Sequence, residues 1–211
     1  MTEKDCVIHG DEVRQQRSRR LVIILIALII LILLVVLITF LVLRPTKPRF
    51  ILQDATLYAF NVSSPSALTI TFQVTLWSKN RNKRVGIYYE KLDVFATYKN
   101  QQITLPTSLP AAYQGHKETT IWSPYLYGVT VPVAPYLAAS LWQDQNAGIV
   151  MVDFKVDGKV KWKVGSWVSG KYHIWVKCPA YITFGRRSTG YPVGPPGAIK
   201  YQLASSCEVD V

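Results

Sequence analysis

The sequence predicts an all-β domain, a sandwich or a barrel with one short helix, preceded by a single transmembrane α-helix. Three observations predict this arrangement. Residues 21–43 form an apolar run without a charged residue, Gly or Pro. All 12 Tyr and all six Trp lie beyond that run, and aromatic residues are enriched in strands. Short apolar stretches in the same region are separated by clusters of Gly, Pro, Asn and Ser, which is typical of sandwiches and barrels.

The apolar run predicts a membrane-spanning helix over residues 21–43. A helix of this length is roughly 35 Å long, enough to cross the hydrocarbon core of a bilayer. A soluble amphipathic helix would have a polar face, whereas Thr39 is the one mildly polar residue of the run. A cleaved signal peptide fits less well, because its apolar region is shorter and residues 44–48 offer no small-residue cleavage site. The helix divides the chain into residues 1–20, 21–43 and 44–211.

Two features predict which side of the membrane each part occupies. Basic residues are slightly more numerous before the run than directly after it, which favours a cytosolic N-terminus. Asn61-Val62-Ser63 is an N-glycosylation sequon, which is usable only on the lumenal side. We therefore expect a cytosolic tail over residues 1–20, an extracellular domain over residues 44–211, and N-glycosylation at Asn61.

The three cysteines fall on both sides of the predicted span. Cys6 lies in the tail, where a reduced thiol is expected and S-palmitoylation is the alternative. Cys178 and Cys207 lie in the extracellular part, where they form either a disulfide or two buried thiols. Their even number in an oxidising compartment favours the disulfide. Closing a loop of this length would stabilise the fold by about 3.6 kcal/mol in the chain-entropy model.

The elements of the β domain follow from alternating apolar residues bounded by turn residues. We predict strands over residues 50–60, 68–77, 85–98, 119–122, 149–156, 159–164, 171–182 and 199–203. One helix is predicted to begin at Pro135 and to end before Gly148. Leu137, Leu141 and Trp142 share one face of this helix, which we expect to cover an open end of the sandwich.

A lysine-rich hairpin is predicted around Asp157-Gly158. A three-residue loop, Val156-Asp157-Gly158, would keep one face apolar, with Gly158 in the left-handed position of a bulged turn. The opposite face would then present a lysine row: Lys155, Lys159, Lys161 and Lys163. Such rows are mostly solvated faces that protect sheet edges, and binding of an anionic ligand is the alternative.

The charge of the chain lies mainly in the extracellular part. Residues 44–211 carry 19 basic and nine acidic residues, a net charge of +10. This excess suits anionic surroundings such as acidic polysaccharide or lipid headgroups, and a merely basic surface is the alternative. Nucleic acid is not expected outside the cell.

The sequence offers no set of catalytic or metal-binding residues. His9 lies on the other side of the predicted span from His116 and His173, and His173 is interpreted as structural. No GxSxG, HExxH or phosphate-binding glycine loop occurs. We therefore predict no metal, no cofactor and no enzymatic activity.

An ordered set of motifs resembles a plant protein family. The motifs are PTKPRF at residues 45–50, the sequon, NRNKRVGIYY at 80–89, YQGHK at 113–117, WSP at 122–124, KWKVG at 161–165 and Cys207. Together they are similar to the non-race-specific-disease-resistance/harpin-induced-like proteins, a branch of the group 2 late embryogenesis abundant family. Arg81 stands where that family usually has Pro. The resemblance implies a fibronectin type III-like antiparallel β-sandwich outside the plasma membrane, and a non-enzymatic role in plant defence or stress signalling.

Two other functions stay open beside that one. A module that binds acidic polysaccharide, such as cell-wall pectin, would need an exposed basic patch beside aromatic rings. A sandwich that binds lipid or another small molecule would need an apolar cavity between its sheets. The partners implied by the resemblance are other membrane proteins of the defence pathway. Both a uniform distribution in the plasma membrane and enrichment at cell junctions (plasmodesmata) are compatible with the sequence.

Overall fold

The computed structural model describes residues 19–38, 45–63, 67–185, 188–194 and 197–211. These residues form two separate compact units, one within Met1–Arg44 and the other over Pro45–Val211. The expectations for Cys6 and for the last residues of the apolar run lie outside the described residues.

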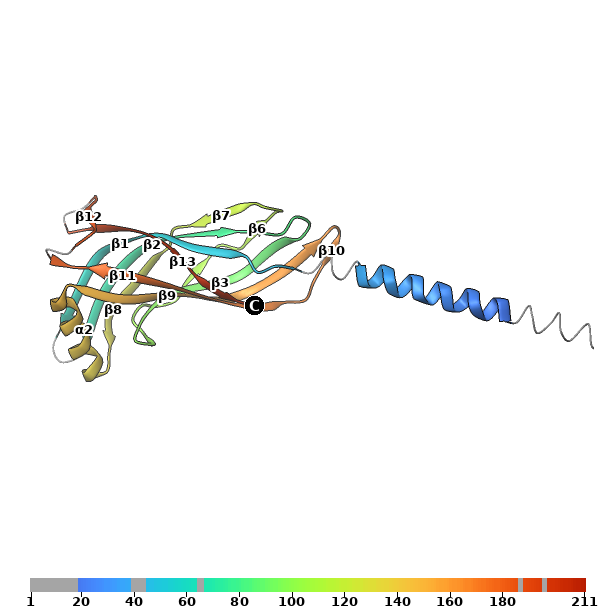
Figure 1. Cartoon of the computed structure of the whole chain (residues 1–211). Helices are drawn as coiled ribbons and strands as arrows, with labels where there is room; N and C mark the ends of the chain where they lie inside the picture. Colours follow the sequence, from blue (N-terminus) through green and yellow to red (C-terminus); the bar gives the residue numbers. More distant parts are fainter. Residues whose placement is uncertain (1–18, 39–44, 64–66, 186–187, 195–196) are drawn as a thin grey trace, which may run out of the picture. The chain divides into compact units, whose positions relative to one another are not determined.

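The described residues of the first unit form one helix, Arg19–Ile38 (Figure 1). Its mean hydropathy is 4.0 and none of it is buried within the protein. Side chains are exposed on every face, so this helix has no packed side of the kind that a soluble core helix has. Its length and composition are those of a candidate membrane span.

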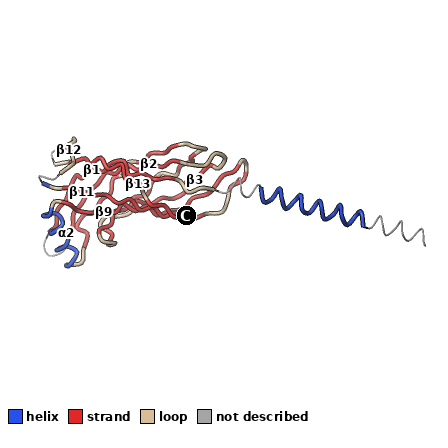
Figure 2. Tube along the Cα trace, viewed as in Figure 1, coloured by secondary structure: helices blue, strands red, loops and turns tan. Residues whose placement is uncertain are grey.

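The second unit consists of two antiparallel sheets (Figure 1). The first sheet orders β12 (Tyr191–Pro192), β13 (Ile199–Ser206), β1 (Arg49–Ser63), β2 (Ala67–Lys79) and β7 (Thr119–Trp122), with β8 (Tyr125–Pro132) also paired to β2. The second orders β14 (Glu208–Asp210), β11 (Tyr172–Thr183), β9 (Ile149–Val164), β3 (Gly86–Tyr98) and β4 (Gln101–Gln102). On this second sheet β5 (Thr107–Leu109) and β6 (Ala112–Gln114) pair with β3, and β10 (Trp167–Val168) pairs with β9. Figure 2 shows that strand dominates this unit.

The two sheets pack face to face through alternate residues of their long strands. Burial in β2 alternates at nearly every position, as expected for a strand with one face in the core. Aromatic rings fill the space between the sheets. The rings of Phe72 and Phe154, from opposite sheets, lie 5.2 Å apart edge to face, and Tyr89 meets Trp122 at 5.3 Å. The expected antiparallel sandwich is confirmed.

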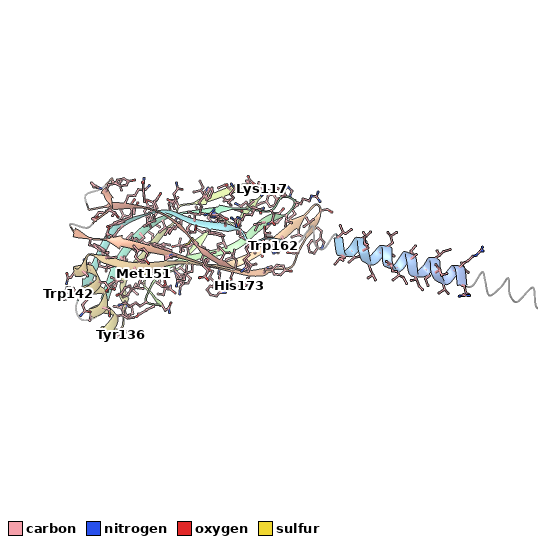
Figure 3. The ribbon with its side chains drawn as sticks, in the orientation of Figure 1. Lys117, Tyr136, Trp142, Met151, Trp162 and His173 are labelled. Carbon is pink, nitrogen blue, oxygen red and sulfur yellow. A yellow bond between two sulfur atoms is a disulfide. The ribbon has the colours of Figure 1, made fainter. Side chains whose placement is uncertain are left out.

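The predicted helix is also confirmed, as α2 (Pro135–Ala147). It ends at Gly148, which has a φ of 89° and donates its backbone N–H to the carbonyls of Asp144 and Gln145. This left-handed position favours glycine. Leu137 and Leu141 face the core. The expectation for Trp142 was wrong, because its side chain is 61% exposed; Figure 3 shows it at the end of the sandwich where Tyr136 also lies.

The predicted hairpin at Asp157-Gly158 was also wrong. The two strands expected around it form one continuous strand, β9. Gly158 lies in the middle of this strand, between Ile174 of β11 and Leu92 of β3. β3 has a bulge between Tyr89 and Lys91 at this point. Glycine is therefore needed here for close strand approach and not for a turn.

Candidate functional site

The structure places the lysine row on the outer face of β9. Alternate residues of a strand point to the same face, so all four lysines project outward while Val156, Val160 and Trp162 are buried. The row therefore shares one face, as expected, although it belongs to a single strand and not to a hairpin. Binding of an anionic ligand by this row stays a prediction.

Carboxylates interrupt the positive charge of this face. Glu90 forms ion pairs with both Lys161 and Lys171. The hydrogen bond from Lys161 holds the pKa of Glu90 below its ordinary value, with Lys171 adding to the effect. Asp153 lies 3.3 Å from Lys177, so the face is a mixed ladder of both signs and not a uniform basic stripe.

His173 belongs to the same outer face, directly opposite Lys159 in the register. Its Nε2 lies 2.7 Å from a carboxylate oxygen of Asp157. Asp153 and Asp157 thus each have a basic partner on β11. Among the described residues no group of His, Cys, Asp and Glu could hold a metal ion.

An aromatic pocket opens beside the end of the lysine row. It has a volume of about 440 Å³ and is lined by Tyr88, Glu90, Ala112, Tyr113, Lys161 and Val168, among others. The rings of Tyr88 and Tyr113 lie 4.5 Å apart. The Lys163 ammonium sits 5.7 Å from the centre of the first ring and 5.2 Å from the second, within the range of cation–π attraction.

Strand pairing and a glycine bring these groups together. Tyr88 of β3 pairs with Tyr113 of β6 on one side and with Lys161 of β9 on the other. A Cβ on Gly86 would lie 2.5 Å from the Tyr113 hydroxyl oxygen. Gly86 therefore leaves room for the Tyr113 ring to lie across the start of β3.

The pocket has a largely apolar, aromatic wall, and the lysines near it differ in whether a carboxylate pairs with them. Lys161 is neutralised by Glu90. Within the described part of the chain, no carboxylate pairs with Lys163 or Lys159. A few polar groups in a largely apolar cleft are typical of a ligand site. Lys163, beside the pocket, donates to the Tyr88 hydroxyl at 3.4 Å and adds a positive charge that no described carboxylate offsets.

The remaining predicted site residues lie away from this pocket. Asn61 is exposed near the end of β1, opposite Thr69 of β2. Cys178 of β11 and Cys207, between β13 and β14, form a disulfide with Cα atoms 4.3 Å apart. Since β11 and β13 belong to different sheets, this bond links the two layers of the sandwich.

Sequence reasoning missed the aromatic half of the pocket. Tyr88 and Tyr113 belong to strands whose pairing cannot be read from local pattern, and the short strand β6 was not predicted. Within the strand predicted over residues 85–98, Tyr88 must point away from the face shared by Ile87 and Tyr89, and the structure shows that Ile87 and Tyr89 are the buried ones.

Comparison with known proteins identifies the family. A model of the late embryogenesis abundant proteins matches residues 75–179. The chain is 51% identical to NDR1/HIN1-like protein 1 of Arabidopsis thaliana over 99% of its length and 100% of that protein. It is 49% identical to NDR1/HIN1-like protein 12 over the full length of both chains, and 38% identical to NDR1/HIN1-like protein 26 over 90% of each. The chain therefore belongs to the NDR1/HIN1-like proteins, plant defence- and stress-related members of the late embryogenesis abundant family.

Proposed function

We propose that this chain is a single-pass plasma-membrane protein of plant defence or stress signalling, with its sandwich outside the cell as a non-enzymatic recognition domain. The observation that carries the proposal is the helix Arg19–Ile38, which is apolar on every face and has no buried side. The sequence similarity to the NDR1/HIN1-like proteins supports the signalling role. On this proposal the partners are other membrane proteins of the same pathway.

The topology is tested at Asn61, the acceptor of the sequon. Its side chain is exposed on the sandwich, so the glycosylation machinery can reach it if the domain enters the secretory pathway. N-glycosidase treatment of the plant-expressed protein should increase the gel mobility of the wild type and leave Asn61→Gln unchanged. An absent shift, together with a sandwich that resists protease in sealed right-side-out vesicles, would reject the extracellular placement.

A second candidate function is binding of acidic polysaccharide such as de-esterified pectin. The aromatic pocket favours it, because Lys163 offers a positive charge directly over two tyrosine rings. A uronic acid unit has a carboxylate for the ammonium and an apolar ring face for the tyrosines. Salt-sensitive retention of the full chain on immobilised polygalacturonate would support this candidate, and complete absence of retention at low salt would reject it.

A further inference from the structure

A group of basic side chains gathers at one end of the sandwich, on the loop between β2 and β3 and on a neighbouring turn. Arg81, Lys83 and Arg84 are exposed on the loop. Lys117 is exposed on the turn before β7, and its backbone N–H donates to the Asn82 carbonyl at 3.2 Å. No carboxylate pairs with any of these four side chains in the described ranges. This basic end is therefore free to attract an anionic surface.

Two buried asparagines hold the basic loop against the first residues of the sandwich. The Asn82 Oδ1 accepts hydrogen bonds from the backbone N–H and the hydroxyl of Thr46, both at 2.8 Å. Its Nδ2 donates to the Thr46 carbonyl at 2.9 Å. Asn80 is fully buried and donates to the carbonyls of Val85 and Gly115. The loop is thus fixed beside Thr46.

An exposed tryptophan lies at the same end. β9 turns at Gly165, with a φ of 58°, and continues as β10 with Trp167 63% exposed and Val168 41% exposed. Lys163, next to this turn, pairs with Gly86 at the start of β3, so the hairpin tip lies beside the basic loop. Figure 1 shows β10 at the end of the sandwich opposite α2. Tryptophan and basic residues together are typical of surfaces that contact lipid headgroups.

The covalent chain limits how far this end can lie from a bilayer. Thr46 is the third residue after Leu43, the last of the apolar run. Even a fully extended chain would place it within about 11 Å of the end of that run. The nearest surface available to the exposed charges is therefore the headgroup layer of the bilayer that holds the anchor.

We propose that this end of the sandwich docks onto anionic lipid headgroups, with Trp167 in the interface and Arg81, Lys83, Arg84 and Lys117 against the negative charges. The inference rests on the membrane anchoring proposed above. The leaflet concerned is the one on the sandwich's side of the membrane, and phosphatidylserine serves below as the anionic probe. Each basic residue near an anionic lipid surface strengthens such an attraction by a factor of about five. Docking would fix the orientation of the outer face of the second sheet relative to the membrane surface.

The test uses the full chain in phosphatidylcholine nanodiscs with and without phosphatidylserine. A nitroxide label is attached at Ser166→Cys in a Cys6→Ser background, since Cys178 and Cys207 are bonded to each other. Two control labels are made separately, at Ala139→Cys on α2 and at Ile30→Cys in the anchor helix. The accessibility of each label to oxygen and to a water-soluble nickel reagent reports its depth in the bilayer.

We expect the Ser166 label to lose nickel accessibility severalfold when phosphatidylserine is present, while the Ala139 label stays in water. Arg81→Gln, Lys83→Gln and Arg84→Gln combined should weaken docking by roughly a hundredfold, and Trp167→Ser should also release the label. High salt should act in the same direction.

The remaining outcomes would overturn the proposal. An Ile30 label in hydrocarbon with a Ser166 label in water would reject docking and leave the anchor intact. An Ile30 label in water would reject the anchor and docking with it. Equal protection of Ser166 in both kinds of nanodisc would reject anionic lipid as the ligand. Protection that needs added polygalacturonate would assign the surface to polysaccharide.

Discussion

Gly158 lies directly against the backbone of Lys91: a Cβ on this glycine would be 2.1 Å from the Lys91 carbonyl oxygen. The contact sits at the bulge of β3, where the neighbouring backbone cannot move without breaking the strand pairing. We expect Gly158→Ala to lower the free energy of unfolding by about 1–3 kcal/mol, the range for overpacked sites. Urea unfolding of the detergent-solubilised chain, followed by tryptophan fluorescence, measures this because all six Trp lie in the sandwich.

Gly170 provides the matched control for this substitution. Nothing lies within 4 Å of a Cβ built on it, so Gly170→Ala should leave the unfolding midpoint nearly unchanged. Equal effects of the two substitutions would contradict the role assigned to Gly158.

Gly158 also shows which part of the fold could not be predicted from the sequence. Asp157-Gly158 has the composition of a hairpin turn, and only the approach of β3, more than 60 residues earlier in the chain, explains it as part of a strand. The anchor and the long strands were predictable because their apolar patterns are local. β8 was missed, and Gly128 within it is again a site of close approach, since a Cβ there would be 2.2 Å from the Ile103 carbonyl oxygen.

The disulfide should contribute strongly to the stability of the sandwich. Cys178 and Cys207 are 29 residues apart, and a loop of that length corresponds to about 3.6 kcal/mol in the chain-entropy model. Cys178→Ala combined with Cys207→Ala should lower the free energy of unfolding by up to this amount, whereas Cys6→Ser should have no effect. Alkylation of the unreduced, denatured chain should label neither Cys178 nor Cys207. Labelling of both would contradict the bond.

Tyr89 should stabilise the fold in a pH-dependent way. Its hydroxyl lies 2.9 Å from the Ser78 hydroxyl and donates to Gln114 at 3.0 Å, and all three residues are buried. Tyr89→Phe leaves these partners unsatisfied and should cost about 1–3 kcal/mol at neutral pH. Urea unfolding of this variant measures the loss, and Tyr172→Phe, at an exposed position, should leave the neutral midpoint unchanged.

At alkaline pH, the contribution of Tyr89 to the free energy of unfolding changes in a defined direction. Burial raises the pKa of Tyr89 in the folded protein. The stabilisation from neutral Tyr89 is therefore complete below the ordinary tyrosine value of about 10, and it declines as the pH rises above that value because the unfolded state ionises first. Tyr89→Phe should make this alkaline decline shallower. An unchanged slope would mean that Tyr89 does not remain protonated in the fold.

The contact between Asn82 and Thr46 can be tested by hydrogen exchange. Asn82→Asp keeps the shape of the side chain but replaces its Nδ2, which donates to the Thr46 carbonyl, with an oxygen. We expect faster exchange at the amide of Thr46 and a loss of about 1–3 kcal/mol from the unpaired carbonyl. Lys83→Ala, at the exposed neighbouring position, should change neither quantity. Unaltered exchange at Thr46 in Asn82→Asp would show that the hydrogen bonds between Asn82 and Thr46 do not order the start of the sandwich.

The pocket was harder to predict than the row of lysines beside it. The four lysines could be assigned to one face because their spacing of two is a local property of a strand. Which of them carries a free charge depends on Glu90 of β3, and the aromatic wall depends on the pairing of β6 with β3. These are contacts between segments far apart in the sequence. They determine which lysines of the row form an ion pair with a carboxylate and which do not.

That division gives a prediction for polysaccharide binding. Lys163→Gln removes an ammonium that no described carboxylate neutralises and that lies over Tyr88 and Tyr113. Lys161→Gln removes one already paired with Glu90, so its loss should matter less. We expect Lys163→Gln to weaken binding of polygalacturonate by roughly two- to fivefold, the scale of an exposed charge contact, and Tyr113→Ala to weaken it at unchanged net charge. Elution of the full chain from immobilised polygalacturonate over a salt gradient measures both effects.

Equal losses in Lys161→Gln and Lys163→Gln, with none in Tyr113→Ala, would indicate nonspecific attraction to a basic surface and not recognition by the pocket.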